Sequence, residues 1–296
     1  MPIKAGNQTL TIFNRLREYA MLMRLHRPIG ALLLLWPTLW ALWLAASGRP
    51  DTRIVMIFVL GVILMRSAGC VINDYADRDF DRHVRRTRDR PLTAERVTAR
   101  EALTLFVLLS GASLILVLQL NRLTIALSLV GALLTLTYPF MKRYTHLAQV
   151  YLGLAFSWGV VLAFAAETTR VPLIAWITFA ANISWVMAYD TEYAMVDRED
   201  DLKIGIKSTA ILFGPWDRFM VGMSHGLALL LLALVGYLAV LGSWYYSGLI
   251  AAACIALYQQ YLLRGREPQR CFQAFLNNNW FGASIFIGLV LNYILE

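Results

Sequence analysis

Residues 54–81 read IVMIFVLGVILMRSAGCVINDYADRDFD, an apolar run long enough to cross a lipid bilayer that ends in a cluster of aspartates. Four of its last nine residues, in the stretch NDYADRDFD at 73–81, are aspartates. Carboxylates this close together repel one another unless a cation lies between them. The stretch therefore predicts a membrane helix whose polar end binds a positively charged group.

The composition of the whole chain indicates a polytopic membrane protein. Of the 296 residues, 58% are hydrophobic and only 16% are charged, whereas a soluble domain carries about 25% charged residues. We expect no soluble domain, linker or cleavable signal peptide. The cysteines, Cys70, Cys254 and Cys271, show neither disulfide nor zinc spacing, so they are expected to be free thiols.

Nine stretches are apolar enough to form membrane-spanning helices of about 20 residues each. These spans are expected at 28–48, 54–72, 102–120, 123–141, 147–166, 171–189, 220–241, 243–263 and 277–295. Several are separated only by short turns. We therefore expect one all-α domain of nine transmembrane helices over residues 1–296, in which residues 1–27 form an N-terminal segment outside the bilayer.

The distribution of basic residues predicts the orientation in the membrane. If the N-terminus is cytoplasmic, 22 of the 27 Lys and Arg residues lie in cytoplasmic segments and four lie on the opposite face. Arg66 alone falls inside a span. Because cytoplasmic loops of membrane proteins are enriched in Lys and Arg, this asymmetry predicts a cytoplasmic N-terminus and a periplasmic C-terminus.

A second polar cluster, YDTEYAMVDREDDLKIGIKST at residues 189–209, follows the sixth span as the first cluster follows the second. Four crossings separate the clusters, so both lie on the same side of the membrane. If each helix continues into its polar segment, successive side chains turn by about 100° and each cluster forms a stripe of oxygen ligands on one helix face. The stripes consist of Asn73, Asp77 and Asp81 in the first cluster, and of Asp190, Asp197 and Asp201 in the second.

Facing stripes of carboxylates and an amide are typical ligands for Mg²⁺. This ion binds one or two carboxylates and completes its coordination shell with water and substrate phosphates. We therefore predict Mg²⁺ with a diphosphate between the two stripes. Asp74 lies at the edge of the first stripe and is the weaker metal candidate. Asp200 points away from the second stripe and is expected to be solvated. Solvated acidic loops at the membrane surface are the alternative interpretation of both clusters.

Three groups of basic residues have competing interpretations. Arg66 inside a span is expected to face a cavity, because a charge in lipid is costly; the alternative is that it reaches the interface. The run RHVRRTRDR at 82–90 is expected to set topology and contact anionic lipid. Lys142 and Arg143 either bind diphosphate or mark the cytoplasmic end of a span. A transporter is the alternative function, although its charges would be expected nearer mid-bilayer.

These motifs resemble those of the UbiA superfamily of intramembrane prenyltransferases. NDYADRDFD matches the motif N-D-x-x-D-x-x-x-D, and Asp190 and Asp197 match the second aspartate motif of that family. The stretches RLHRPIGALLLLWPTLWAL, YPFMKRYTHLAQV and NNNW resemble the branch that prenylates 4-hydroxybenzoate, from about Arg24 onward. Other branches carry a further aspartate where this chain has Tyr193 or Ala194, which argues against those branches.

The resemblance implies nine helices around a central cavity that opens to the cytoplasmic face and laterally to lipid. It also implies a Mg²⁺-dependent reaction in the bacterial inner membrane, an early membrane step of ubiquinone biosynthesis. A polyprenyl group passes from polyprenyl diphosphate to the carbon of 4-hydroxybenzoate meta to its carboxylate, and diphosphate is released. A naphthoate, homogentisate or haem as acceptor is the alternative. Nucleic acid is not an expected partner.

The roles expected of individual residues follow from this reaction. The metal ligands would be Asn73, Asp74, Asp77, Asp81, Asp190 and Asp197. Arg143 would contact the diphosphate by analogy with the family, with Lys203 or Lys207 assisting. Arg66 is the candidate for the benzoate carboxylate, bound as a bidentate pair, with Arg24 and Arg27 as alternatives. Asp190 is the candidate to accept the proton that the ring releases.

Overall fold

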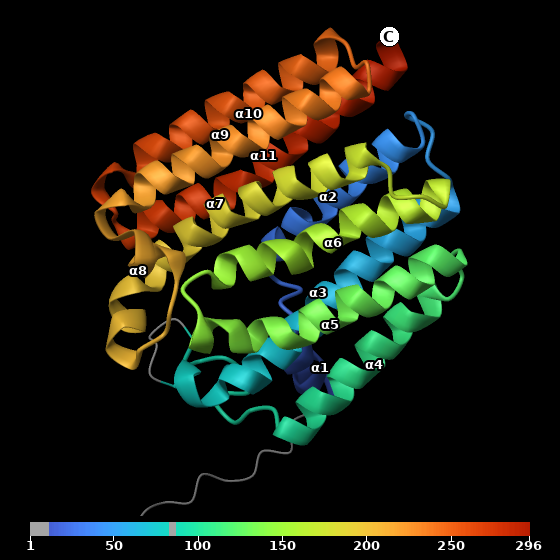
Figure 1. Cartoon of the computed structure of the whole chain (residues 1–296). Coiled ribbons are helices and arrows are strands. Elements are labelled where there is room, and N and C mark those ends of the chain that lie inside the picture. Colours follow the sequence, from blue (N-terminus) through green and yellow to red (C-terminus); the bar gives the residue numbers. More distant parts are fainter. Residues whose placement is uncertain (1–11, 83–86) are drawn as a thin grey trace, which may run out of the picture.

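The structure is a computed structural model that describes residues 12–82 and 87–296, and all its regular elements in these ranges are helices. Residues 1–11 of the expected N-terminal segment, and 83–86 of the basic run, lie outside the described residues. The long helices run side by side in one bundle (Figure 1). The elements are α1 (Ile12–Leu22), α2 (Ile29–Ala45), α3 (Thr52–Asp81), α4 (Ala99–Val117), α5 (Arg122–Tyr144), α6 (Ala148–Thr168), α7 (Leu173–Ile204), α8 (Thr209–Phe213), η1 (Gly214–Trp216), α9 (Asp217–Leu238), α10 (Ser243–Leu262), η2 (Leu263–Gly265) and α11 (Pro268–Leu295).

Eight helical segments of the described chain are long and apolar enough to cross a membrane, which confirms the all-α, membrane-spanning class. Of the nine expected spans, the one at 28–48 is missing from these eight. It corresponds to α2, which has only 17 residues. This length is near the lower limit for a transmembrane helix. α2 nevertheless lies inside the bundle, where it packs against α3, α6 and α11 and buries Leu33, Trp40 and Leu42. Crossing of the membrane by α2 remains a prediction.

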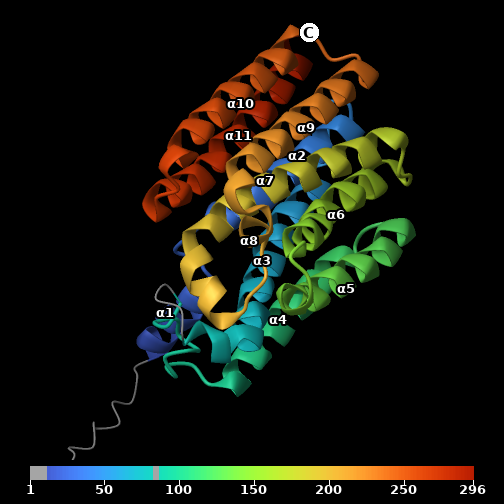
Figure 2. The same ribbon diagram turned by 60° about the vertical axis from the view of Figure 1, so that its left-hand side comes forward.

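The two helices that carry the aspartate clusters extend well beyond their apolar segments. α3 continues to Asp81 instead of ending near 72, and α7 continues to Ile204 instead of ending near 189. At 1.5 Å per residue, α3 is about 45 Å long, whereas the hydrocarbon core of a bilayer is about 30 Å thick. The continuation on which the two stripes depend is therefore present, and it carries the aspartates beyond the apolar part of each helix. Figure 2 shows the polar ends of α3 and α7 at the same end of the bundle.

The remaining helices form the scaffold behind α7. α7 packs against α6, α9 and α11, and α10 lies along α11. α10 and α11 approach so closely at Gly248 that a Cβ atom there would lie 2.7 Å from the carbonyl oxygen of Ser284. Such small-residue packing is typical of membrane helices. α11 begins at Pro268, nine residues before the expected start, because the polar residues that precede its apolar part continue the helix.

α1 was not expected, since residues 1–27 carry no apolar run of sufficient length. The helix is held by contacts with the beginning of α4. The hydroxyl of Tyr19 donates a hydrogen bond of 2.7 Å to Glu101, and Arg15 forms a 3.2 Å ion pair with the same carboxylate. Glu101 also completes a capping box with Thr98 at the start of α4. These contacts place α1 at the same end of the bundle as the aspartate clusters.

Cysteine labelling in intact cells tests whether α2 crosses the membrane. We expect the variant Asp51→Cys, after α2, to react with a membrane-impermeant maleimide. Arg17→Cys in α1 and Arg100→Cys at the start of α4 should react only after the membrane is disrupted. Labelling of Arg17→Cys in intact cells together with Asp51→Cys would show that α2 does not cross.

Candidate functional site

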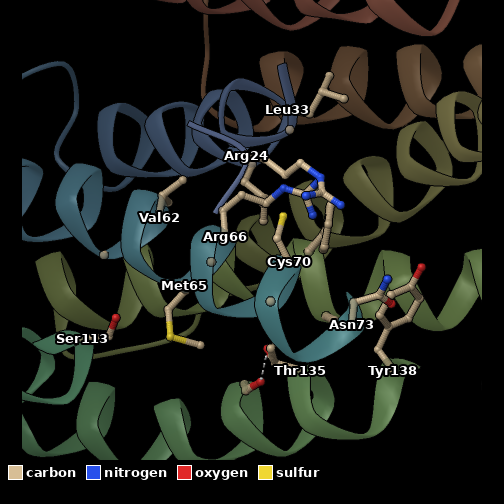
Figure 3. A pocket seen from close by; sticks show the side chains of 18 of the residues that line it. Arg24, Leu33, Val62, Met65, Arg66, Cys70, Asn73, Ser113, Thr135 and Tyr138 are labelled. Carbon is tan, nitrogen blue, oxygen red and sulfur yellow. Dashed lines mark hydrogen bonds between the residues drawn. The ribbon is translucent and has the colours of Figure 1, made fainter. Parts of the chain in front are cut away.

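A cavity of about 930 Å³ lies among α2 to α7 and α11. Along α3 it extends from Asn73 and Asp74 at the polar end to Ile57 and Phe58, a distance of about 24 Å along the helix axis. Its polar end carries charged side chains, and most of its remaining lining is apolar. Figure 3 shows Arg66, Cys70 and Asn73 on one face of α3, with Tyr138 of α5 beside Asn73. The cavity therefore combines a charged end with a long apolar compartment.

Each aspartate stripe contributes one residue to the polar end of this cavity. Asn73 of α3 and Asp190 of α7 both line it. The phenol of Tyr138 interacts electrostatically with Asp77 on α3 and with Asp190 on α7, so these two carboxylates lie near the same group. Asp77 is almost fully buried. Asp197 is half-buried and lies about two turns beyond Asp190 along α7. The structure thus brings together residues more than a hundred positions apart in the chain.

Asp74 and Asp81 are engaged by arginines. The carboxylate oxygens of Asp74 accept hydrogen bonds of 2.9 and 2.7 Å from Arg24 and one of 2.9 Å from Arg90. The same Arg90 guanidinium donates to Asp81 over 2.7 Å. Asp74 is only 1% exposed, so its charge is compensated by two guanidinium groups rather than by water. Asp74 is therefore the residue of the first motif least suited to hold a metal.

Arg90 is a residue of the site that sequence reasoning missed. The run 82–90 was assigned to topology and lipid contact, yet the Arg90 side chain lines the cavity. It reaches Asp74 and Asp81 from the segment between α3 and α4. Helical spacing predicts which side chains share a face, but not the course of such a connection, so no pattern in the sequence identifies this contact.

The other basic candidates lie in three different settings. Arg143 is exposed and donates a 2.7 Å hydrogen bond to the carbonyl of Ala76 on α3, next to Asp77. Lys203 pairs with Asp200 at the surface over 3.3 Å, and Lys207 donates to the carbonyl of Tyr144. Neither lysine lines the cavity. The structure thus brings Arg143, but not the lysines, close to the first motif.

Arg66 lies in the cavity without a carboxylate partner. Its guanidinium interacts electrostatically with tyrosines and with Cys70, and it forms no hydrogen bond or ion pair with any residue that the structure describes. It packs on the backbone of Gly30, where a Cβ atom would lie 2.5 Å from Nε of Arg66, and over the ring of Phe156 at 5.7 Å. Because a buried cation without a counter-ion is costly, this guanidinium is positioned to receive an anion.

Tyr189 presents a second unused polar group to the cavity. The residue is 2% exposed and lines the cavity, and its hydroxyl has no hydrogen-bond partner in the described part of the chain. The phenol interacts electrostatically with Arg66. A buried hydroxyl normally finds a partner, so a ligand in this region would meet both a guanidinium and a hydroxyl donor.

The entrance beside α1 and α2 is positively charged. Arg24, His26 and Arg27 all line the cavity. Partial desolvation lowers the pKa of His26, and the positive charges of Arg27 and Arg24 lower it further. The remaining guanidinium groups make the polar end attractive to polyanions.

The donor set at the polar end fits a hard cation such as Mg²⁺. In the ranges described, no three His, Cys, Asp or Glu side chains cluster tightly enough to hold a metal on their own. Mg²⁺ does not require such a cluster, because it binds one or two carboxylates and retains water or phosphate ligands. Asn73 and Asp190 line the polar end of the cavity and supply the oxygen ligands it prefers, and Asp77 lies near the Tyr138 phenol beside them.

Sequence comparisons identify close relatives. The UbiA prenyltransferase family matches residues 34–285. The chain is 58% identical to a 4-hydroxybenzoate octaprenyltransferase of Aeromonas salmonicida, over 94% of this chain and 96% of that protein. It is 60% identical to a protein of the same description from Nitrosococcus oceani, over 95% and 98% of the two chains.

Solved structures share the fold. A UbiA homologue from Aeropyrum pernix K1, without ligand, matches with a TM-score of 0.79 at 24% identity, over 88% of this chain and 97% of that one. A UbiA homologue from Archaeoglobus fulgidus bound to GPP and Mg²⁺ matches with a TM-score of 0.68 at 18% identity, over 90% and 99%. The extent of the family match and the identities to curated relatives, together with this fold, show that the chain belongs to the UbiA prenyltransferase family.

Proposed function

We propose that the protein transfers a polyprenyl group from polyprenyl diphosphate to the carbon of 4-hydroxybenzoate meta to its carboxylate, releasing diphosphate. The observation that carries this proposal is one cavity with three features. It has aspartates at its end, an arginine deeper inside that has no anionic partner among the described residues, and a long apolar compartment. Relatives with 56–60% identity are described as 4-hydroxybenzoate octaprenyltransferases. The reaction would be an early membrane step of ubiquinone biosynthesis.

The donor diphosphate would bind at the polar end. Asn73, Asp77 and Asp81 on α3, with Asp190 and Asp197 on α7, would hold Mg²⁺, which when bound stabilises the negative charge that develops on the departing diphosphate. Asp74 would instead hold Arg24 and Arg90 in place. Binding of GPP and Mg²⁺ by the homologue from Archaeoglobus fulgidus supports this use of a divalent metal.

Basic side chains would contact the same diphosphate. Arg143 donates to the backbone of α3 at Ala76, next to Asp77. Its guanidinium would therefore lie near a diphosphate bound to Mg²⁺ that Asp77 helps to hold. Lys203 and Lys207 would have to leave Asp200 and Tyr144 to reach it. We therefore assign the diphosphate contact to Arg143 before either lysine.

The acceptor would lie deeper in the cavity, with its carboxylate on Arg66. A guanidinium can form two parallel hydrogen bonds to a carboxylate, and the Tyr189 hydroxyl is available beside it. Arg24 is less suited to this role because it already forms an ion pair with Asp74. Arg27 lies at the entrance. Asp190 would accept the proton that the ring releases after the prenyl group has been added.

The apolar compartment would hold the prenyl chain. Its lining between α2, α3, α4 and α5 includes Leu33, Phe58, Leu116 and Leu120. We expect the donor to enter from the bilayer and the product to return to it. The same proposal places the protein in the bacterial inner membrane, with both aspartate motifs and the N-terminus on the cytoplasmic side.

A transfer assay in membranes tests this function. Membranes containing the protein are supplied with radiolabelled 4-hydroxybenzoate and geranyl diphosphate, with Mg²⁺ or with EDTA. We expect label in the organic phase only when both the donor and Mg²⁺ are present. Correctly inserted protein that transfers no label would contradict the proposed acceptor, and naphthoate or homogentisate would then be tested.

Substitution of one aspartate in each motif tests the metal site. Asp77→Ala and Asp197→Ala should each lower kcat by at least a factor of about 100, since an electrostatic contact to the developing charge is lost. Asp79→Ala and Asp200→Ala are matched controls on the same helices, and they should retain activity because these side chains point away from the stripes. Near-normal activity of Asp77→Ala or Asp197→Ala in inserted protein would remove that residue from the metal shell.

Substitutions of Arg66 and Arg143 should weaken the binding of different substrates. Arg66→Gln removes a charged pair worth about 3 kcal/mol, so the KM for 4-hydroxybenzoate should rise roughly a hundredfold while the KM for the donor changes little. Arg143→Gln should raise the KM for prenyl diphosphate far more than that for the aromatic acid. Steady-state kinetics with each substrate varied in turn would reveal the reverse pattern if the two assignments were exchanged.

A further inference from the structure

A buried group of hydrogen-bonded side chains lies in the core behind α7 and is not part of the cavity. Its centre is Asn278 of α11, which is fully buried. The amide oxygen of Asn278 accepts a 2.8 Å hydrogen bond from Nε1 of Trp185 and lies 3.3 Å from Nε2 of His225. Its amide nitrogen donates to the carboxyl of Glu192 over 2.8 Å and to the carbonyl of Ala274 over 3.2 Å. This cluster joins α7, α9 and α11.

The chemistry of the cluster requires an amide at position 278. The indole of Trp185 can only donate a hydrogen bond, which orients the amide oxygen of Asn278 toward it. The amide nitrogen then faces Glu192, whose carboxyl group is also fully buried. One side chain therefore supplies an acceptor on one side and a donor on the other. The next residue along α11, Asn279, accepts a hydrogen bond from Trp36. Hydrogen bonds to tryptophan indoles thus explain two of the three asparagines in the stretch NNNW at 277–280.

The cluster lies on the side of α7 that faces away from the cavity. Glu192 follows Asp190 by two residues, which corresponds to about 200° around the helix axis. Trp185 connects the two sides, because its ring packs edge-on against Tyr189 with 5.4 Å between centroids, and Tyr189 lines the cavity. The aspartate stripe and the buried cluster therefore occupy opposite faces of one helix.

Apolar packing alone specifies the rotation of α7 poorly. The part of α7 within the bundle carries apolar side chains on nearly all sides, so a small turn about its axis would exchange one apolar contact for another. Directional hydrogen bonds between helices are the main alternative means of fixing such a helix in a membrane protein. Within the described chain, the buried carboxyl of Glu192 and the indole of Trp185, about two turns apart on α7, both bind one residue of α11.

We propose that Asn278 and Glu192 are positioning residues that set the rotation of α7 so that Asp190 and Asp197 face the stripe on α3. This inference rests on the metal role proposed above for Asp190 and Asp197. Neither positioning residue touches substrate. Their loss would weaken the binding of metal and diphosphate before it affected the acceptor, because the acceptor contact at Arg66 is carried by α3.

Ligand-dependent thermal unfolding tests this role without turnover. The protein in nanodiscs is titrated with geranyl diphosphate in the presence of Mg²⁺ and without acceptor, and the rise in Tm gives a half-saturating concentration. We expect Asn278→Leu and Glu192→Leu to raise that concentration roughly five- to tenfold, the size of coupling that packed side chains carry. Glu192→Gln retains an oxygen that can accept from Asn278, and it should remain within about twofold of the unaltered protein.

The matched control is Asn292→Leu, the same substitution near the other end of α11. Asn292 is also buried and accepts a 2.7 Å hydrogen bond from the backbone of Gly242. This variant should lower the ligand-free Tm but leave the half-saturating concentration unchanged. It therefore separates a general loss of stability from a loss of alignment at the site.

The outcomes are distinct. An unchanged half-saturating concentration in Glu192→Leu, or an equal increase in Asn292→Leu, would overturn the positioning role. Glu192→Leu decides the question if Asn278→Leu does not fold. A protein with unaltered sequence that shows no rise in Tm with Mg²⁺ and geranyl diphosphate would contradict the proposed function, and the positioning role with it.

Discussion

The cost of removing charge from water governs the arrangement of this protein. Its aspartate motifs lie where α3 and α7 extend past their apolar segments. Asp74 and Asp81 are nearly buried there, and arginines compensate their charges. Asp217 illustrates the rule that a deeply buried charge is paired, because it contacts Arg198 and Arg266 at 3.0 and 2.8 Å. Arg66 departs from this rule within the described chain, because it lies in the cavity without an anionic partner. A site that keeps a cation unpaired in this way is prepared for a substrate that brings its own negative charge.

α7 carries both the second aspartate motif and the contacts that join it to the scaffold. Asp190 faces the cavity, whereas Glu192 is held from behind by Asn278. α3 divides its length in a similar way, with the aspartate motif at its polar end and Arg66 two turns deeper. In the proposed reaction, the distance between these groups along α3 would separate the diphosphate from the acceptor carboxylate. Rigid helices that carry both sets of residues can therefore orient two substrates without a moving domain.

Much of this organisation could be predicted from the sequence, because it depends on periodicity within single helices. The apolar spans, the two aspartate stripes and the position of Arg66 all follow from residue spacing along α3 and α7. What could not be predicted depends on contacts between segments distant in the chain. Arg90 reaches Asp74 from the segment that leads to α4, and Asn278 reaches Glu192 from another helix. α1 is stabilised by Glu101 rather than by its own composition.

The central claim is that both helix ends bind one diphosphate while Arg66 binds the acceptor. An experimental structure in nanodiscs, with Mg²⁺, 4-hydroxybenzoate and a thiolo-diphosphate analogue of the donor that cannot react, tests it most directly. We predict metal and diphosphate between Asp77 and Asp190, and the acceptor carboxylate on the guanidinium of Arg66. Diphosphate bound by one helix alone, or a carboxylate placed away from Arg66, would contradict it.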